Sequence, residues 1–389
     1  MRLDGVRILD LTRLLPGPYA TQLLADAGAD VVKLEDTGAG DYARHMPPAT
    51  DDGVGAVFDA VNRGKHSVAI DLKHEDGRAA FYELVADADV VVESFRPGVT
   101  ERLGVDYGTL TDHREDLVYC SLTGYGQNGP YADRAGHDLN YVGLAGLLDM
   151  TRASVDETPR MPGYQVADMA GGLFAAFSVC SALLSRELGN TGGEYLDVAL
   201  TDAVVSFSQA LAPEALGDGD PRPGETALTG QYPWYDVYET GDGRYVTLGA
   251  LEPRFWTTFC EAVDRPDLAD KHMTGDPAER EALREELADL FASRTRDEWV
   301  DELAGVDAAV DGVYTPRETL EHPQIAARGY VERPADGAPR VGLPLRGSDI
   351  PTDATGGPPG HGEHTETVLM AAGLDAEELE RLREAGAIS

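Results

Sequence analysis

Two ionisable side chains lie in segments rich in glycine and small residues. His137 falls in GYGQNGPYADRAGHDLNY, and Asp168 falls in VADMAGG further along the chain. Glycine allows the backbone to approach another group closely and to adopt conformations that are strained for other residues. An imidazole and a carboxylate in such surroundings are candidates for taking and returning a proton.

Both residues also have structural explanations. His137 precedes a helix start at which Asp138 or Asn140 could serve as the cap, so it is equally suited to be a turn histidine. Asp168 opens an apolar helix, where aspartate is a common N-terminal cap. Capping and catalysis are compatible, because either role holds the carboxylate at a buried helix start. We also expect the backbone N–H groups of residues 168–171 to be available to a developing negative charge.

A small group of cations stands out against the charge of the whole chain. Asp and Glu number 69 against 32 Lys and Arg, which gives a formal net charge of −37. Arg63, Lys65 and His66 nevertheless lie together in NRGKHSVAIDL, and Arg96 lies beside Pro-Gly in SFRPGVTERLG. Clustered cations in an acidic protein suggest a ligand that carries several phosphate charges. The alternative is that they are ordinary surface cations.

Charge and cysteine content indicate the setting of the protein. Acidic residues are spread along the whole chain, so we expect a surface that repels nucleic acid and anionic membranes. Molar salt screens their mutual repulsion, because the Debye length there falls to about 3 Å, which predicts the cytoplasm of a salt-loving microbe.

No apolar run reaches the roughly 20 residues of a membrane span, and the N-terminus lacks the features of a signal peptide. Cys120, Cys180 and Cys260 are odd in number and lie in apolar contexts, as reduced cysteines do.

The order of apolar segments predicts an α/β fold. Residues 6–35 have the pattern strand, helix, strand, which is typical of a parallel βαβ unit. Further strands are expected at 67–72, 89–95, 117–122 and 193–200, with helices at 77–88 and 169–188. These elements predict a large doubly wound, Rossmann-like domain, in which ligands bind at the carboxyl ends of the parallel strands. Arg13 and Glu35 follow or end the first two strands, so they are candidates to face that site, although ordinary surface charges fit equally well.

A second, smaller domain is expected after a Gly- and Pro-rich stretch. WYDVYETGDGRYVTLGAL has the pattern of two alternating strands joined by a tight turn, and acidic helices follow at about 276–293 and 296–304. This pattern predicts an α+β domain. The expected organisation is a large α/β domain at 1–211, a linker at 212–230, a small α+β domain at 231–321, and a return connection with a C-terminal helix on the large domain at 322–389.

Several motifs in the same order resemble those of the family III CoA-transferases, the CaiB/BaiF superfamily. They are DLTRLLPGPYATQLLADAGADVVKLE, NRGKHSVAIDLK, FRPGVTERLG, LTGYGQNGPYADRAGHDLNY, ADMAGG and HTETVL, which together span nearly the whole chain. Within that family, GHDLNY and LEPRFW resemble the branch of racemases that act on 2-methyl-branched acyl-CoA thioesters. The transferase members usually lack the histidine of GHDLNY.

The resemblance implies a role for three residues and a way of assembling the site. His137 and Asp168 match the acid/base pair of the racemases, and Glu252 in LEPRFW matches a glutamate thought to orient the histidine. The family further implies an interlocked homodimer, with each site between the large domain of one subunit and the small domain of the other. Glu252 would then assist His137 across the subunit boundary.

The resemblance also implies where CoA and the substrate bind. The matched regions that contact CoA are represented here by Asn62, Arg63, Lys65 and Arg96. Further candidates for substrate contact lie in the segment around His137, namely Gly124, Tyr125 and Tyr141.

These residues together predict a racemase or epimerase that works by two-base 1,1-proton transfer through an enolate. Because the α-proton is far less acidic than imidazole or carboxyl, the enolate has to be stabilised. No metal and no added cofactor are expected, since CoA enters as part of the substrate.

The alternative is a CoA-transferase in which Asp168 is the nucleophile and forms an aspartyl-CoA thioester. A nonenzymatic CoA-binding protein and a nicotinamide oxidoreductase fit less well, the latter because GxGxxG is missing.

Overall fold

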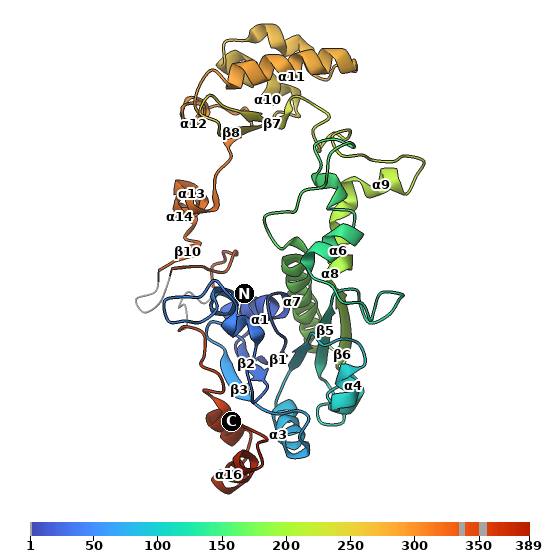
Figure 1. The fold of residues 1–389 in the computed structure, drawn as a ribbon, viewed down its shortest axis with the longest axis vertical. Coiled ribbons are helices and arrows are strands. Elements are labelled where there is room, and N and C mark those ends of the chain that lie inside the picture. Colours follow the sequence, from blue (N-terminus) through green and yellow to red (C-terminus); the bar gives the residue numbers. More distant parts are fainter. Residues whose placement is uncertain (1, 334–338, 350–355) are drawn as a thin grey trace. The chain divides into compact units, whose positions relative to one another are not determined.

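The computed structural model describes residues 2–333, 339–349 and 356–389 of the chain (Figure 1). The chain divides into two compact units. The first contains Met1–Leu147, Pro162–Ser208 and Arg328–Ser389, and the second contains Leu148–Met161 and Gln209–Ala327. The expected boundary at residue 211 lies near the division at Ser208. The stretch expected to be a linker, 212–230, belongs to the second unit and begins with a short helix, α9 (Ala212–Ala215).

A parallel sheet of six strands forms the centre of the first unit. The strand order is β3-β2-β1-β4-β5-β6, with every neighbouring pair parallel. This order is that of a doubly wound fold, so the predicted fold class is confirmed. The strands are β1 (Arg7–Leu11), β2 (Asp30–Glu35), β3 (His66–Ala69), β4 (Val90–Glu93), β5 (Val118–Thr123) and β6 (Glu194–Ala199).

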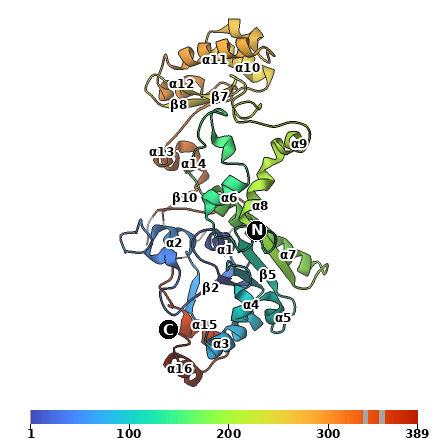
Figure 2. The ribbon, with the colours of Figure 1, turned by 45° about the vertical axis from the view of Figure 1, so that its right-hand side comes forward.

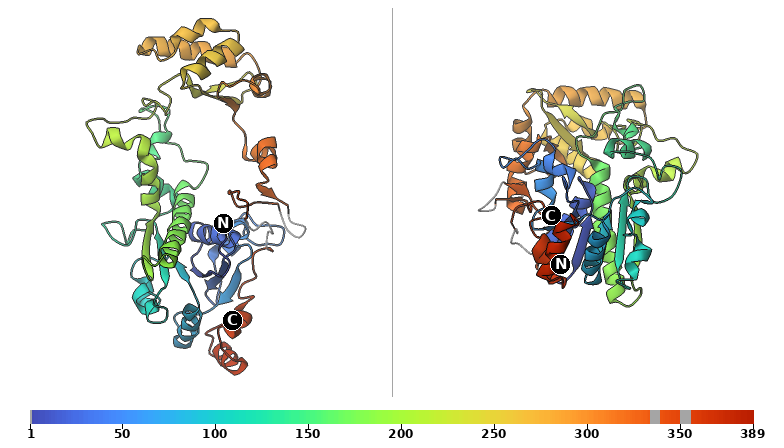
Figure 3. Two further views of the ribbon diagram at one scale, coloured as in Figure 1. Left: turned by 180° about the vertical axis from the view of Figure 1, so that it is seen from behind. Right: turned by 60° about the horizontal axis from the view of Figure 1, so that its bottom comes forward.

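Helices cover both faces of this sheet. On one face α7 (Val166–Glu187) packs along α1 (Pro16–Asp26), and Figure 3 shows the two running side by side. On the other face lie α3 (Glu75–Ala86), α15 (Thr365–Ala371) and α16 (Ala376–Glu384), where α15 contacts both α3 and β3 (Figure 2). The shorter helices of this unit are η1 (Tyr42–His45), α2 (Ala56–Val61), α4 (Val99–Leu103), α5 (Tyr107–Thr111), α6 (Asp138–Leu144), α8 (Leu200–Val205) and η3 (Ser206–Ala210).

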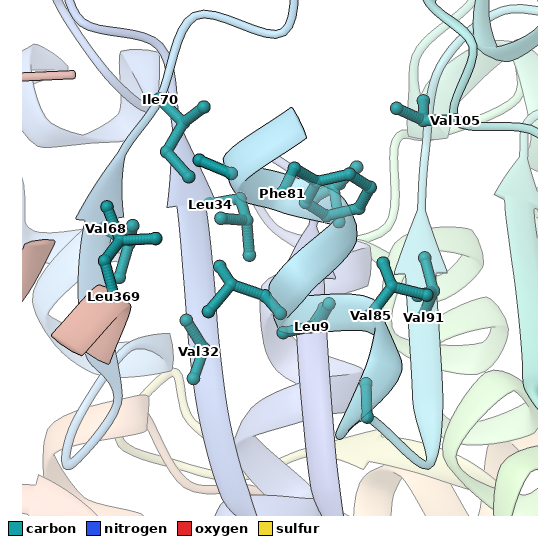
Figure 4. Close-up of a cluster of buried hydrophobic side chains, with 14 of the residues drawn as sticks. Leu9, Val32, Leu34, Val68, Ile70, Phe81, Val85, Val91, Val105 and Leu369 are labelled. Carbon is teal, nitrogen blue, oxygen red and sulfur yellow. The ribbon is translucent and has the colours of Figure 1, made fainter. Parts of the chain in front are cut away.

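Alternation along the strands separates an apolar face from a charged one. Leu9, Val32 and Val68 point toward α3, where they pack with Phe81 and Leu369 in the main core (Figure 4). Successive side chains of a strand point to opposite faces. The residues next to them in sequence therefore face α1 and α7, and three of these are the buried polar side chains Asp10, Lys33 and Ser67.

The buried charges on that face form a paired network. Lys65 and Asp10 are both fully buried, and the Lys65 ammonium lies 3.1 Å from an Asp10 carboxylate oxygen. The ammonium also donates hydrogen bonds to Thr21 Oγ1 at 2.8 Å, Asn62 Oδ1 at 2.9 Å and the Pro18 carbonyl at 3.0 Å. Burying an ion costs several kcal/mol unless its charge and hydrogen bonds are satisfied. The contacts of Lys65 meet this requirement and tie β1, α1 and the segment before β3 together.

Two further ion pairs extend this network toward the carboxyl ends of the strands. The Lys33 ammonium lies 3.0 Å from Asp41, and the Arg44 guanidinium lies 2.6 Å from Glu35. Arg44 also donates to the Pro359 carbonyl at 2.9 Å, so the loop after β2 is held to the returning C-terminal segment. We refer to Asp10, Lys33, Glu35, Asp41, Arg44 and Lys65 as the buried ion network.

The long helix α7 corresponds to the helix expected at 169–188. By length and composition it could cross a membrane, which corrects the statement that no apolar run reaches that size. Half of its apolar window is nevertheless buried within the unit, as in the core helix of a globular domain. Gly171 and Gly172 permit this packing, because an added Cβ would lie 2.1 Å from Leu200 or 2.5 Å from the Pro16 carbonyl oxygen.

The second unit is a small α+β domain with its own aromatic core. The expected hairpin is present as β7 (Tyr235–Glu239) and β8 (Tyr245–Gly249), and β9 (Val310–Gly312) adds a third antiparallel strand. Trp234, Trp256 and Trp299 lie in the core between this sheet and the helices. The helices are η2 (Asp149–Thr151), α10 (Pro253–Ala262), η4 (Pro266–Lys271), α11 (Pro277–Phe291), α12 (Arg296–Leu303) and α13 (Pro316–Glu321). The connection back to the first unit contains α14 (Pro323–Arg328), β10 (Val331–Glu332) and β11 (Arg340–Val341).

The buried ion network predicts a large stability cost for removing one partner. Lys65→Met keeps the length of the side chain but leaves Asp10 without its nearest cation, so we expect the free energy of unfolding to fall by about 3–5 kcal/mol. Urea denaturation in molar salt measures this change. Lys73→Met is the control, because Lys73 is exposed and its substitution should cost no more than about 0.5 kcal/mol. Equal stability of the two variants would contradict the assigned role of Lys65.

Candidate active site

A pocket of about 370 Å³ opens at the carboxyl ends of β1 to β4. This is the edge at which parallel α/β sheets bind ligands, and where we expected the site. Its lining comes from the segments that follow four different strands, namely Leu11, Arg13, Leu34, Glu35, Asp36, Thr37, Gly38, Tyr42, Ile70, Asp71, Leu72, Lys73, Phe95 and Leu103.

Arg13 and Glu35 both line this pocket, but their charges are differently engaged. The Arg13 guanidinium is partly exposed, lies 3.9 Å from Asp36, and lies over the Tyr42 ring with 5.3 Å to its centroid. Glu35 is buried and accepts hydrogen bonds from Arg44 and from Ser67 Oγ at 2.6 Å. Burial alone would raise its pKa, but these hydrogen bonds hold the pKa of Glu35 at about 2. Arg13 is thus open to a ligand, whereas Glu35 holds the loop after β2.

The side chains of Asn62, Arg63 and Lys65 make their contacts inside the first unit. Asn62 donates to the Phe58 carbonyl at 3.1 Å and accepts from Lys65, and Arg63 pairs with Asp26 at 3.1 Å. Burial lowers the pKa of Lys65 to about 8 despite the adjacent Asp10. Contact of these residues with CoA stays a prediction, and the structure gives their side chains a role in holding the segment before β3.

Arg96 is an exposed cation in the turn between β4 and α4. Among the residues that the structure describes, no carboxylate lies within 4.0 Å of its guanidinium. Phe95 beside it lines the pocket, and the charge of Arg96 acts on Tyr141 to lower the pKa of that phenol slightly against other influences. An exposed cation next to a pocket residue and near Tyr141 suits the predicted contact with an anionic ligand.

Glu93 is a buried carboxyl beneath this turn. It ends β4, and its Oε2 accepts the Phe95 N–H at 2.7 Å while Ser121 also hydrogen-bonds to it. Burial raises the pKa of Glu93 to about 7, and the charges of Glu101 and Asp197 add to the effect. Nothing in the apolar strand VVVE predicted this position, because the sequence does not show which charges surround it.

His137 is the residue that caps α6. Neither Asp138 nor Asn140 occupies the cap position that was expected of one of them. Asn140 stabilises the helix start from the first turn, because its Oδ1 accepts the His137 backbone N–H at 3.0 Å. The His137 side chain is exposed. This placement leaves the imidazole accessible to a ligand.

Asp138, the next residue, holds the start of α7 rather than that of its own helix. Its Oδ1 accepts the N–H of Ala167 at 2.7 Å and the N–H of Asp168 at 3.1 Å. The residue at the cap position of α7, Gln165, makes no side-chain capping hydrogen bond. Asp168 is consequently not the cap of the helix, as one explanation had it, but a residue of its first turn.

Asp168 has the ionisation behaviour of a group poised near neutral pH. Burial raises the pKa of Asp168 to about 7, and the negative charge of Asp138 contributes in the same direction. A carboxyl with a pKa near the working pH can both accept and donate a proton. Perturbed carboxyls of this kind are concentrated in active sites.

Tyr141 connects the helix α6 to the segment before it. Its hydroxyl donates to the Gly136 carbonyl at 2.6 Å, and its ring packs edge-on against Tyr125 with 5.0 Å between centroids. An added Cβ at Gly124 would lie 2.4 Å from the Tyr141 ring, and one at Gly136 would lie 2.7 Å from it. The glycines around His137 therefore allow close packing of Tyr141, whereas we had interpreted them as freedom to approach a ligand.

The expectation that residues 168–171 offer backbone N–H groups to the reaction is wrong. The Asp168 N–H is taken by Asp138, and the Met169 N–H donates to the Gln165 carbonyl at 3.0 Å. The later residues are inside the helix, where each N–H bonds to a carbonyl one turn earlier.

Glu252 lies in the second unit, exposed, at the cap position of α10 and directly before Pro253. The other site residues that the sequence predicts all lie in the first unit. There the structure brings Asp168 together with Asp138 and Tyr141, and Arg96 near Tyr141. Within the described ranges, no group of three or more His, Cys, Asp or Glu side chains is arranged to hold a metal ion.

The chain matches the model of the family described as CoA-transferase family III over residues 3–365. It therefore belongs to this family, as the motifs indicated. A solved structure titled as a CAIB/BAIF family protein from Brucella suis has a TM-score of 0.82 with 31% identity, covering 95% of this chain and 98% of the other.

Relatives of this chain have two different activities. It is 37% identical to succinyl-CoA:mesaconate CoA-transferase of Haloarcula hispanica, over 96% of each chain. It is 33% identical to alpha-methylacyl-CoA racemase of Homo sapiens, over 98% of this chain and 96% of the relative. Membership of the family thus defines an enzyme of the CoA-transferase and racemase group and leaves the reaction open.

Proposed function

We propose that the chain is a racemase or epimerase of 2-methyl-branched acyl-CoA thioesters. The observation that carries the proposal is the link between His137 and Asp168, since the residue directly after the histidine hydrogen-bonds to the backbone of the aspartate. An imidazole and a carboxyl whose pKa is about 7 are then held by adjoining helix starts. Similarity to alpha-methylacyl-CoA racemase over nearly the whole chain supports the same activity.

The proposed reaction removes the proton from one face of a carbon and adds a proton to the opposite face of the same carbon. One of the two groups removes the proton next to the thioester carbonyl, which leaves an enolate. The other group delivers a proton to the opposite face, and the configuration is inverted. Both directions need one protonated and one unprotonated partner, and a carboxyl near half ionisation at neutral pH supplies either state. CoA enters and leaves with the substrate, so we propose that no added cofactor or metal takes part.

A CoA-transferase is the second candidate, and the 37% identity to the Haloarcula enzyme favours it. In that reaction the Asp168 carboxylate would attack a thioester and form an aspartyl-CoA thioester. Hydroxylamine would convert such an intermediate to a hydroxamate at Asp168, which mass spectrometry detects. His137 has no necessary part in the transferase reaction. Its position directly before Asp138, which hydrogen-bonds to the backbone of Asp168, therefore supports the racemase.

Exchange with solvent deuterium tests the proposed racemase. Incubation of (R)- or (S)-2-methylacyl-CoA in D₂O at high salt should introduce deuterium at C2 and erase the optical purity of either enantiomer. His137→Ala should lower the rate of racemisation of either enantiomer by about 10²–10⁴-fold, because one of the two proton-transfer groups is gone. Two results together would establish the transferase instead. The wild type would show no exchange at C2, and CoA transfer to an added free carboxylate would survive in His137→Ala.

We further propose that two copies of the chain form an interlocked homodimer, as in the family that the motifs resemble. One side of α7 supports this, because Leu173, Phe177, Leu184 and Leu188 are each more than half exposed. A second copy would cover this apolar surface. Light scattering in molar KCl should give the mass of two chains, and a mass of one chain at all concentrations would contradict the proposal.

The net charge of −37 supports a cytoplasm rich in salt as the setting of this enzyme. Relatives from two Haloarcula species are consistent with it.

A further inference from the structure

One side chain connects the two segments that carry the reacting groups. Asp138 is the first residue of α6, and His137 immediately before it caps that helix. The Asp138 carboxylate reaches α7 and accepts two of the N–H groups of its first turn, those of Ala167 and Asp168. These N–H groups have no partner within the helix. Without Asp138 they would be unsatisfied, because Gln165 provides no capping side chain.

We propose that Asp138 is a positioning residue, which fixes the Asp168 carboxyl relative to His137 by capping the helix that presents it. This inference rests on the proposed function only in taking Asp168 as the reacting carboxyl, and both candidate reactions do so. Asp138 Oδ1 and the N–H groups that it accepts are far apart in sequence but within hydrogen-bond distance. This single oxygen atom therefore couples the position of α6 to the position of the start of α7.

The charge of Asp138 gives the residue a second effect on the site. Two nearby carboxylates disfavour each other's ionised form, and burial together with Asp138 raises the pKa of Asp168 to about 7. The positive end of the α7 dipole stabilises the Asp138 carboxylate at its cap position. The pair therefore divides its roles, with Asp138 as the fixed charge and Asp168 as the group that gains and loses a proton.

Other ionisable groups on elements that pack against α7 complete the surroundings of Asp168. Tyr141 of α6 interacts with Asp168, with Tyr125 after β5 and with Arg96 after β4. Burial raises the pKa of Tyr141 to about 12, with Tyr125, Asp168 and Asp138 acting in the same direction and the positive charge of Arg96 acting against them. The charge of Asp138 acts on Asp168 itself and, after burial, raises its pKa. Elements that pack against α7 also carry Tyr19 on α1, Asp202 on α8 and Asp197 on β6, but none of these three is among the groups that shift the pKa of Asp168.

The geometry allows the two effects of Asp138 to be separated. Both capping hydrogen bonds end on the same atom, Oδ1. Asp138→Asn therefore keeps an oxygen that can accept both N–H groups while it removes the charge. Asp138→Ala removes the charge and the cap together. Asp375→Asn is a matched control, since Asp375 caps the distant helix α16 through the N–H of Glu378 at 2.9 Å.

The direct measurement is the titration of the Asp168 carboxyl by difference infrared spectroscopy of isotope-labelled protein, with Asp168→Asn identifying its band. We expect Asp138→Asn to lower the titration midpoint by roughly 0.5–1 pH unit, and Asp375→Asn to leave it unchanged. The sign follows from the charge, because loss of a neighbouring carboxylate makes ionisation of Asp168 easier.

Kinetics should then distinguish the two variants from each other. In Asp138→Asn the pH dependence of kcat/KM should shift to lower pH by the same amount as the infrared midpoint, with the maximal rate retained. In Asp138→Ala the maximal kcat should fall at least about 10-fold while KM changes little, because the carboxyl is no longer held in place. Thermal unfolding of both variants reports whether they fold.

Two results would overturn the inference. One is an Asp168 titration in Asp138→Asn identical to that of the wild type, and the other is an Asp138→Ala variant with the kcat of Asp375→Asn. The infrared measurement needs no turnover. If the wild type fails to exchange deuterium but its Asp168 titration shifts as stated, the proposed racemase is wrong and the role of Asp138 stands.

Discussion

The buried ion network is the constraint on which the ligand-binding edge of the sheet depends. It places three carboxylates and three cations on one face of the sheet, namely Asp10, Glu35, Asp41, Lys33, Arg44 and Lys65. Each charge has a partner, and a buried charge that loses its partner is strongly destabilising. The network therefore fixes the ends of β1 and β2 and the loop after β2, from which much of the pocket is built.

From this edge the packing of α1 and α7 leads to Asp168, the carboxyl proposed to react. Gly172 brings α7 within van der Waals contact of the start of α1, and Asp138 holds the first turn of α7. Two aspartates thus lie close together at one helix start with different functions. One accepts backbone hydrogen bonds and stabilises the helix, whereas the other has its pKa raised to about 7 by partial burial and by the first carboxylate. Environment rather than residue type separates the two roles.

Much of the fold was predictable because the elements are encoded by local apolar patterns. The strands, the hairpin at 235–249 and the long apolar helix follow from runs that are visible in the sequence. The partners of buried charges were not predictable, since Lys65 pairs with Asp10 far earlier in the chain and its sequence neighbours suggested a surface phosphate site. Asp138 was one of two residues that could have capped its own helix, and only the fold shows that it caps α7. Strand β9 was missed because its three residues, VDG, are too few to show the alternation of a strand.

The central claim is that His137 and Asp168 act on opposite faces of one carbon. The most direct test uses (R)- and (S)-2-methylacyl-CoA deuterated at C2, incubated in H₂O with His137→Gln and with Asp168→Asn. Each variant should still wash out deuterium from one enantiomer, a different one for each variant, and neither should racemise the substrate. Loss of label from the same enantiomer in both variants, or from neither enantiomer with the wild type, would contradict the account.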